Sequence, residues 1–565
     1  MSRIMRRASI GLAAAAIAGI PLLKIEPQPI ASYAFGIVTG IGYAVLIPPR
    51  KGAYVESIMG AGSFAFPLWG IANIVPFPAL SGRFMEAGFA SMQEQLPDLF
   101  LWIFFGVLLG FLMQLGSDGV DAFWGKEAQE DAVPPVASRH ILILGGGFAG
   151  MKTAERLEEM LATDSSVSIT LVSETNALLF TPMLAEVAGS SLEPSHISPP
   201  LRTSLLYTQV VRGSVTSIDL EKRAVVIDAT SRNGFGHELK YDHLVLALGA
   251  VSNYLGMANV EKSAFNFKTL LDAIRIRNHV IEMFERADKE SDLGIRSRLL
   301  TFVVAGGGFA GVELAGALND FTHSILADYR NLTKDELQII LVHSRDRILP
   351  ELSEELALYA LKKMAERGVI FRLNTRLTDA EPGKVVLSDG SISADTLIWT
   401  AGTTPNLLLK ELPLDTDKRG AVIVDTTLAV GRRPGVWAIG DCAVVTDART
   451  GKPCPPTAQF AIREAAVLAR NIHASLEGRP LESFHFDSLG ALCVIGHQTA
   501  CAEITVPFTG SKSFRFSGLL AWGMWRGIYL MKLPGLERKL RVLTAWTLEL
   551  FFPRDSVQTI DLGER

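Results

Sequence analysis

One six-residue sequence occurs twice in this chain, and the repeat constrains the fold more than any other feature. Gly-Gly-Gly-Phe-Ala-Gly fills positions 145–150 and again 306–311. Each copy follows a short apolar run, 140–144 or 300–305, that is typical of a buried strand. A strand, a glycine-rich turn and a helix in this order start a dinucleotide-binding unit. The chain is therefore predicted to have an α/β fold with two Rossmann-like dinucleotide-binding domains.

The glycines of each turn have separate roles. The first makes the tight turn, the second lets the backbone approach a pyrophosphate, and the third lets the helix pack on the strand. The helices, predicted at 151–161 and 312–319, then offer free N–H groups to the phosphates. The residues expected to contact nucleotide are Gly145, Gly147, Phe148, Ala149 and Gly150 in the first turn, and Gly306, Gly308 and Gly311 in the second.

Two dinucleotide sites in one chain are most simply filled by a flavin and a nicotinamide nucleotide. After the first turn, the strand predicted at 168–172 ends at Ser173 and Glu174. An acid about 20 residues beyond such a turn commonly binds ribose hydroxyls. Glu174 is therefore expected to hold the adenosine ribose of the first nucleotide, and a solvated turn glutamate is the simpler alternative.

The strand after the second turn, predicted at 338–342, ends differently. His343 stands where an acid is expected, and Arg345 and Arg347 follow. An acid at this point favours NAD, whereas a nearby arginine can accommodate the 2′-phosphate of NADP. The sequence leaves NADH and NADPH open as the electron donor, and both arginines could equally be ordinary surface charges.

Three further segments are typical of a flavoprotein. Residues 241–249 and 396–402 each predict a strand that runs into a turn of small residues. Residues 436–441 predict a short strand that ends at a carboxylate, which can accept hydrogen bonds from a sugar-alcohol chain. The residues expected to bind nucleotide in these turns are Gly249, Gly402, Gly440 and Asp441.

The first 130 residues differ from the rest of the chain in composition. The protein has a mean hydropathy of +0.27 and only 20% charged residues, which indicates that part of it lies in or on a bilayer. Apolar stretches at 8–23, 31–47, 57–80 and 99–115 predict up to four transmembrane helices, since a crossing needs about 20 apolar residues. The last stretch is the strongest candidate, and prolines interrupt the third. One or two crossings are the alternative.

The distribution of charge predicts the orientation in the membrane. Three arginines precede the first apolar stretch, and Arg50 and Lys51 follow the second. Four crossings would keep these positive groups and the nucleotide-binding region on the cytoplasmic side. The protein is thus expected at the cytoplasmic membrane with its catalytic domain facing the cytoplasm. The same beginning of the chain also fits a cleaved signal peptide.

Charge and cysteine content disfavour several classes of protein. The net charge of -5 gives no reason to expect a nucleic-acid partner. Four cysteines in 565 residues exclude a disulfide framework, and no metal site is predicted. A disulfide reductase or a sulfide:quinone reductase needs cysteines at the flavin face. The cysteines of this chain are Cys442, Cys454, Cys493 and Cys501, none of which lies between the first turn and Asp441.

From residue 140 to about 554 the chain resembles the type II NADH:quinone oxidoreductases, which are single-subunit enzymes that do not pump protons. Besides the two turns, the matching segments are FTPMLAEVA (180–188), FKTLLDAIR (267–275), GVELAG (311–316), PPTAQ (455–459) and GLLAWGMWR (518–526). The resemblance implies FAD in the first unit and NADH or NADPH in the second, on opposite sides of the flavin plane. It also implies a quinone that reaches the flavin from the membrane.

The resemblance further implies roles for individual residues around the flavin. Thr181 and Pro182 would lie near the isoalloxazine, and Asp441 would hold the ribitol. Glu313 matches the family's acid just after the second turn and would lie near the nicotinamide. A helix-start glutamate favoured by the helix dipole is the simpler explanation of that residue.

The expected quinone site departs from the family pattern at one position. Ala458 and Gln459 match the start of Ala-Gln-x-Ala-x-Gln, but Arg463 replaces the later glutamine. Arg463 could still donate a hydrogen bond to a quinone carbonyl, although the change puts the identity of the acceptor in doubt. The residues expected in catalysis are Glu313, Gln459 and Arg463.

The C-terminal region combines aromatic residues with arginines and lysines. This composition suits amphipathic helices that lie among lipid headgroups, and a packed core or a homodimer interface is the alternative. The predicted organisation is a membrane region (1–130), a linker (131–139), an FAD-binding domain in two parts (140–262 and 406–480), an NAD(P)H-binding domain (263–405) and a C-terminal membrane-anchoring region (481–565).

The expected function is transfer of electrons from NAD(P)H through FAD to a membrane quinone, without proton pumping. In such a reaction the protein mainly holds two cofactors in contact. Two alternatives stay open at this point. One is an FAD-dependent NAD(P)H oxidoreductase with a ferredoxin or disulfide acceptor, and the other is a nucleotide-binding redox sensor without quinone turnover.

Overall fold

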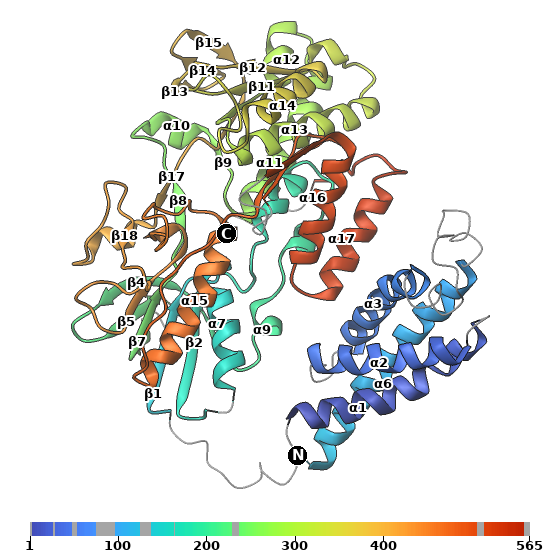
Figure 1. Ribbon diagram of the computed structural model, residues 1–565. Coiled ribbons are helices and arrows are strands. Elements are labelled where there is room, and N and C mark those ends of the chain that lie inside the picture. Colours follow the sequence, from blue (N-terminus) through green and yellow to red (C-terminus); the bar gives the residue numbers. More distant parts are fainter. Residues whose placement is uncertain are drawn as a thin grey trace. The chain divides into compact units, whose positions relative to one another are not determined.

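The computed structural model describes residues 3–25, 29–47, 54–74, 96–124, 137–162, 164–228, 237–505 and 513–558 (Figure 1). The chain divides into two compact units, Met1–Pro134 and Pro135–Arg565. The first unit is helical, and the second contains every described strand.

The first unit packs its helices closely through small residues. Its elements are α1 (Arg3–Ala18), η1 (Ile20–Lys24), α2 (Pro29–Leu46), α3 (Tyr54–Ile74) and α6 (Leu96–Trp124). A Cβ atom at Gly106 would lie 2.3 Å from the Ala61 carbonyl oxygen, and one at Gly110 would lie 2.1 Å from that of Ser57. The backbones of α3 and α6 can approach this closely only because these positions are glycine.

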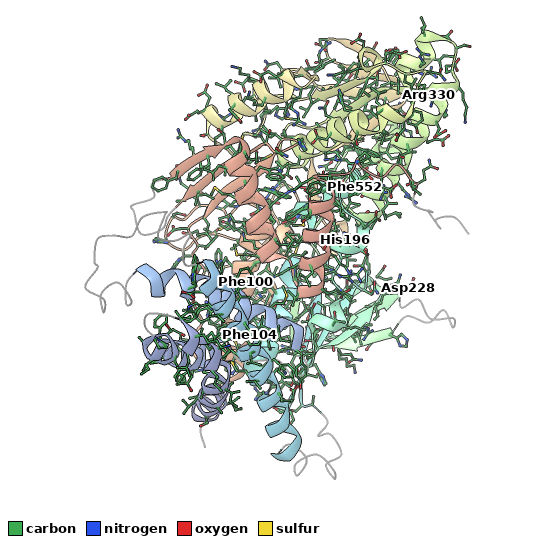
Figure 2. The ribbon with its side chains drawn as sticks, turned by 90° about the vertical axis from the view of Figure 1, so that its right-hand side faces the viewer. Phe100, Phe104, His196, Asp228, Arg330 and Phe552 are labelled. Carbon is green, nitrogen blue, oxygen red and sulfur yellow. The ribbon has the colours of Figure 1, made fainter. Side chains whose placement is uncertain are left out.

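Helix α6 carries the strongest membrane signal in this unit. Its segment Asp98–Gly119 is, among the described residues, the one long and apolar enough to cross a membrane. Figure 2 labels Phe100 and Phe104 of this helix, which are 73% and 53% exposed. The first two predicted stretches also form helices, and the part of the third beyond residue 74 lies outside the described residues. Four crossings therefore stay a prediction.

A five-stranded parallel sheet forms the first half of the second unit. Its strand order is β19 (Val436–Ala438), β7 (His243–Leu246), β1 (Arg139–Leu144), β2 (Val167–Ser173) and β3 (Gln209–Arg212). Helices α7 (Phe148–Leu161) and α15 (Ala458–Leu476) pack against each other beside it. The central strands are mostly buried and apolar, as expected for a parallel sheet covered on both faces, whereas the edge strand β3 is exposed at its ends.

A second five-stranded parallel sheet repeats this arrangement. Its order is β12 (Val369–Arg372), β11 (Gln338–Val342), β10 (Thr301–Ala305), β16 (Thr396–Trp399) and β9 (Phe265–Asn266). Its helices are α10 (Ala258–Ser263), α11 (Leu270–Lys289), α12 (Leu293–Leu299), α13 (Phe309–Ile325) and α14 (Glu354–Glu366).

Smaller antiparallel sheets complete the second unit. They are β4 (Ser214–Asp219), β5 (Ala224–Asp228) and β6 (His237–Lys240); β13 (Leu377–Glu381), β14 (Lys384–Leu387) and β15 (Gly390–Ser393); β17 (Thr403–Pro405) with β8 (Ala250–Ser252); and β21 (Gly490–Val494), β22 (Ala500–Thr505) and β23 (Ser513–Ser517). The last of them leads into α16 (Gly518–Lys532) and α17 (Leu536–Leu548), drawn in red in Figure 1.

The prediction of an α/β fold with two parallel-sheet nucleotide-binding units is confirmed, with local corrections. The two helices begin at Phe148 and Phe309, inside the repeated hexapeptide, rather than at 151 and 312. The last three residues of each hexapeptide already form the first helical turn. Helix α13 also runs on to Ile325, because its buried apolar face continues past 319. The linker predicted at 131–139 extends one residue too far, since Arg139 already belongs to β1.

Candidate nucleotide and acceptor site

The first glycine-rich turn requires glycine at its ends. Gly145 has a φ of +114°, and a Cβ atom there would lie 2.1 Å from the Ala247 carbonyl oxygen. A Cβ atom at Gly150 would lie 1.9 Å from the Gly145 carbonyl oxygen. Gly147 caps α7 with open space beside it, and no described side chain bonds to the free N–H groups of the helix. An anionic group fits this helix terminus.

The second turn has the same geometry. Gly306 has a φ of +124°, and a Cβ atom there would lie 2.4 Å from the Thr400 hydroxyl oxygen. A Cβ atom at Gly311 would lie 1.9 Å from the Gly306 carbonyl oxygen. Gly308 caps α13, again without a side-chain cap among the described residues. Both turns thus fit the pyrophosphate of a dinucleotide.

Gly146 and Gly307 are the second residues of the two turns, and each packs against the residue that ends the neighbouring strand. A Cβ atom at Gly146 would lie 2.3 Å from the Ser173 hydroxyl oxygen, and one at Gly307 would lie 2.6 Å from Cγ of His343. Ser173 and His343 therefore occupy equivalent positions in the two units. Glu174, the predicted ribose ligand, is exposed immediately after Ser173.

Asp441 is paired with a lysine that sequence reasoning did not single out. Lys268 Nζ lies 3.8 Å from Asp441 Oδ2, although the two residues are far apart in the chain. Burial raises the pKa of Asp441, and Lys268 opposes this rise. The Gly440 N–H donates to Glu464 Oε2 at 2.7 Å, which fixes the turn that carries Asp441. The pair fits the hydroxyl-rich chain of a flavin nucleotide.

Aromatic rings link the first turn to the C-terminal helices. The Phe180 ring makes edge contacts with Phe148 at 5.7 Å and with Tyr529 of α16 at 6.2 Å between centroids. Thr181 and Pro182 directly follow Phe180 in the 3-10 helix Thr181–Met183, where Thr181 is exposed. The two residues predicted beside the isoalloxazine therefore lie close to the first turn and to α16.

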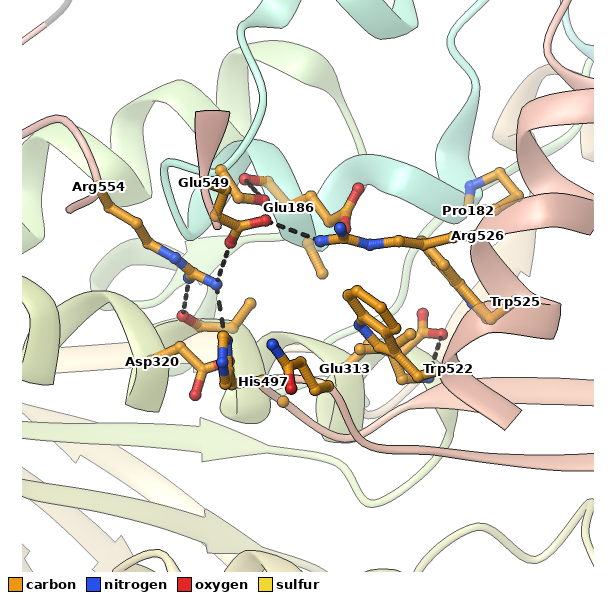
Figure 3. Close-up of a pocket in the computed structure, with 16 residues that line it drawn as sticks. Pro182, Glu186, Glu313, Asp320, His497, Trp522, Trp525, Arg526, Glu549 and Arg554 are labelled. Atoms are coloured by element: carbon orange, nitrogen blue, oxygen red, sulfur yellow. Dashed lines mark hydrogen bonds and ion pairs between the residues drawn. The ribbon is translucent and has the colours of Figure 1, made fainter. Parts of the chain in front are cut away.

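A cavity of about 30 Å³ lies beside these residues (Figure 3). This volume is enough for a water molecule. The side chains that matter for its chemistry are Pro182, Glu186, Glu313, Trp522, Trp525 and Arg526. They come from α8 (Leu184–Ala188) with the turn before it, from α13 and from α16.

Glu313 lies in the first part of α13 and faces this cavity. Its Oε1 accepts a hydrogen bond from the Val494 N–H at 3.4 Å. Burial, with a smaller contribution from Glu186, raises the pKa of Glu313 to about 8. The carboxyl group therefore carries a proton at neutral pH.

Glu186 is a second acid on the cavity, and it was not predicted as a site residue. Burial raises its pKa to about 7, and Arg526 opposes this rise. Arg526 also begins a chain of ion pairs: it contacts Glu549 at 2.7 Å, and Glu549 contacts Arg554 at 2.9 Å (Figure 3). Glu186 is part of the FTPMLAEVA segment, so a resemblance to the family could have pointed to it.

The two residues predicted for the quinone lie elsewhere. Gln459, near the start of α15, uses its amide to accept from the Leu489 N–H at 3.1 Å and to donate to the Gly490 carbonyl at 3.2 Å. Arg463 is exposed, with its guanidinium 5.2 Å from the centroid of the Phe486 ring. Neither is among the described residues that line the cavity. Their role in quinone binding stays a prediction.

The remaining predicted residues are placed as follows. Gly249 has a φ of +67° and open space at its Cβ position, whereas a Cβ atom at Gly402 would lie 3.3 Å from the Asn253 carbonyl oxygen. Ala458 begins α15 after the cap residue Thr457. Arg347 donates to the Pro350 carbonyl at 3.1 Å, which makes it a structural residue of its loop.

The cysteines do not form the pair that a disulfide reductase uses. All four are free thiols, and Cys442, Cys493 and Cys501 are buried. Burial raises the pKa of Cys442 to about 12, so its reactive thiolate form is scarce at neutral pH. The Cys442 thiol donates to the Leu246 and Ile439 carbonyls, each at 3.3 Å. This thiol has a structural role.

Comparison with known proteins agrees with this geometry. Residues 139–465 match the family model of the pyridine nucleotide-disulphide oxidoreductases. The type II NADH:quinone oxidoreductase Ndh of Mycobacterium tuberculosis is 30% identical over 76% of this chain and 92% of its own length. A probable NADH dehydrogenase of Dictyostelium discoideum is 32% identical over 74% and 91%.

This chain belongs to the type II NADH:quinone oxidoreductase family. A solved structure of NDH2 from Plasmodium falciparum in complex with NADH has the same fold, with a TM-score of 0.67 and 18% identity over 74% of this chain and 100% of that one. The sulfide:quinone oxidoreductase of Aquifex aeolicus is similar in fold, with a TM-score of 0.55 and 17% identity over 76% of this chain and 100% of that one.

Proposed function

We propose that this protein passes electrons from a nicotinamide nucleotide through FAD to a membrane quinone, without pumping protons. The observation that carries the proposal is the pair of glycine-rich turns, each of which leaves a helix terminus uncapped by side chains of the described region. The named relatives oxidise NADH and reduce quinone according to their names, and the proposal extends that activity to this chain.

The residues of the first unit fit FAD. The turn at 145–150 would hold its pyrophosphate, Glu174 the adenosine ribose, and Asp441 with Lys268 the ribitol. When bound, FAD takes up a hydride and passes on electrons singly or in pairs. Thr181 and Pro182 would border its ring, and the second turn with Glu313 would position the nicotinamide.

Reduction of a quinone also consumes two protons. Glu313 and Glu186 are protonated or half-protonated near neutral pH and face a cavity that has room for water. Glu313 would influence how the nicotinamide meets the flavin, and it would not be the sole donor of these protons. The quinone itself would lie near Gln459 and Arg463.

The C-terminal helices support membrane association. Large apolar side chains are exposed on and just after them: Leu519, Leu520, Met531, Leu543, Leu548, Leu550, Phe551 and Phe552. Arg538, Lys539 and Arg541 precede the last helix turns, and such a mixture suits the lipid headgroup region. Pairing of two copies through the same helices is the competing explanation of this surface.

The N-terminal helices would add a transmembrane anchor to this peripheral contact. Segment Asp98–Gly119 supports at least one crossing. In the proposed arrangement the catalytic unit faces the cytoplasm, at the cytoplasmic membrane, as the positive charges around 3–7 and 50–51 predict.

Stopped-flow spectroscopy of detergent-solubilised holoprotein tests the proposal. NADH should bleach the flavin absorbance within the mixing experiment, and a short-chain ubiquinone or menaquinone analogue should restore it. Bleaching without reoxidation by either quinone would favour a ferredoxin-type acceptor or a redox sensor. A variant with Gly308→Val should load FAD normally but lose the bleaching step, because only its second turn is blocked.

A further inference from the structure

The two nucleotide-binding units can be compared position by position, because Gly146 and Gly307 are equivalent residues of the two turns. Gly146 packs on Ser173 at the end of β2, and Gly307 packs on His343 at the end of β11. The next residue in the first unit is Glu174, a carboxylate suited to ribose hydroxyls. The next residue in the second unit is Ser344, so the acid of the first unit has no counterpart here.

A hydrogen-bond donor without a protein partner lies at this point of the second unit. His343 Nδ1 accepts from the Gly307 N–H at 3.0 Å, so in the neutral ring the hydrogen is on Nε2. Nε2 is buried and has no hydrogen-bond partner among the described residues. Burial and the neighbouring Arg345 lower the pKa of His343, which keeps the ring neutral. Buried donors are nearly always hydrogen-bonded, so this N–H is free to donate to a ligand.

Arg345 supplies positive charge beside that donor. It is exposed, and its backbone is held in place because its carbonyl accepts from the Asn374 N–H at 2.9 Å. The Thr375 N–H donates to the His343 carbonyl at 3.0 Å, which fixes the same loop from the other side. Arg347, in contrast, is committed to the Pro350 carbonyl. One arginine of this loop is therefore available to a ligand.

Two acids lie near the loop, and neither replaces the missing carboxylate. Asp346 is exposed and follows Arg345. Glu351 has its Oε1 3.5 Å from the Cβ position of Gly308, at the N-terminus of α13 rather than at the end of β11. An acid at the strand end selects against a 2′-phosphate by charge repulsion, whereas arginine there attracts it.

We infer that the second site accepts NADPH, and that Arg345 binds the 2′-phosphate while His343 Nε2–H donates to the same ribose. The inference rests on the proposed function and names its electron donor more closely. It makes Arg345 a specificity-determining residue of the nicotinamide nucleotide site.

Calorimetric titration of the holoprotein with 2′,5′-ADP and with 5′-AMP, which lacks only the 2′-phosphate, tests this without turnover. The wild-type protein should bind 2′,5′-ADP about tenfold more tightly than 5′-AMP. Arg345→Ala should abolish that preference, and Ser344→Glu should reverse it. Arg330→Ala, an exposed arginine of the same unit labelled in Figure 2, is the matched control and should keep the preference. Raised salt should weaken 2′,5′-ADP binding more than 5′-AMP binding.

Flavin reduction by the two nucleotides gives the second readout. Arg345→Ala should raise the KM for NADPH about tenfold and that for NADH less than twofold. Equal binding of 2′,5′-ADP and 5′-AMP by the wild type, or equal effects of Arg345→Ala on the KM for NADPH and for NADH, would overturn the inference. If NADH still bleaches the flavin and quinone restores it, the proposed function survives that result.

Discussion

The indole Nε1 of Trp546 lies 3.2 and 3.1 Å from the two carboxylate oxygens of Glu186 and donates a hydrogen bond to them. This contact joins α17 to the FTPMLAEVA segment across 360 positions of sequence. The C-terminal helices therefore form part of the wall of the site, and do more than provide an apolar surface. Trp546 also packs on Trp525 of α16, which lines the cavity.

Glu186→Gln should change how stability depends on pH. Burial raises the folded-state pKa of Glu186 from 4.5 to about 7. The folded state then binds more protons at Glu186 than the unfolded state does between pH 4.5 and pH 7. The contribution of Glu186 to the free energy of unfolding is therefore greatest below pH 4.5 and is lost as pH rises through 7. Relative to the wild type, the glutamine variant should gain on the order of 1–3 kcal/mol between pH 5 and pH 8. Denaturant titrations at both pH values measure this. The same difference in free energy of unfolding between variant and wild type at pH 5 and at pH 8 would contradict the prediction.

Glu313→Gln should alter the pH profile of turnover. Burial raises the pKa of Glu313 to about 8, so the wild type loses this proton, and activity with it, above that pH. The glutamine variant should be slower at pH 7, by roughly tenfold, with a profile that no longer falls near 8. Steady-state rates with saturating NADH and quinone from pH 6 to 9 measure this. Glu411→Gln, an exposed acid, is the control, and a retained fall near pH 8 in Glu313→Gln would assign that step to another group.

Asp441→Ala should weaken flavin binding. Lys268 lies 3.8 Å from the Asp441 carboxylate, so removal of the acid leaves the lysine charge uncompensated and removes the acceptor for ribitol hydroxyls. We expect at least tenfold weaker FAD binding, or roughly 1.4 kcal/mol, and a smaller loss for Asp441→Asn. The ratio of flavin to protein absorbance after gel filtration reports it. Asp425→Ala, at an exposed turn, should keep its flavin.

Gln459→Ala should mainly lower stability, and Arg463→Ala should mainly weaken the binding of the quinone acceptor. The Gln459 amide is engaged with the backbone at 489 and 490, and its loss leaves these groups unpaired. The expected destabilisation is about 1–3 kcal/mol. Arg463 is exposed and stacks on one ring, so its removal should raise the KM for quinone severalfold at nearly unchanged stability. A raised KM for quinone in Gln459→Ala at unchanged stability would contradict this and show that Gln459 acts mainly on the acceptor.

The parts of the fold that sequence could predict are those governed by local geometry. The two turns were predictable because Gly145 and Gly306 adopt positive φ values that other residues avoid, and because a Cβ atom would clash there. The predicted strand at 338–342 coincides with β11, a short buried apolar run. The strand predicted at 436–441 begins as β19 but ends at Ala438, because Gly440–Cys442 form a 3-10 turn that carries Asp441.

The parts that sequence could not predict depend on residues far apart in the chain. Lys268 meets Asp441, and Trp546 meets Glu186, only after both sheets and the C-terminal helices have assembled. Gln459 fits the quinone-site pattern as a sequence, yet its amide is used by the start of β21. No local signal predicts this contact, because residues 459 and 490 meet only in the folded chain.

In the proposed function, electrons pass from nicotinamide nucleotide to quinone only through the flavin of this chain. Protein stripped of flavin, incorporated into lipid vesicles with a long-chain quinone and supplied with NADH under anaerobic conditions, tests it directly. Quinone reduction should be absent, and addition of FAD should restore it in proportion to the flavin bound, with no acidification or alkalinisation of the vesicle interior. Equal quinone reduction before and after FAD is added would contradict the account.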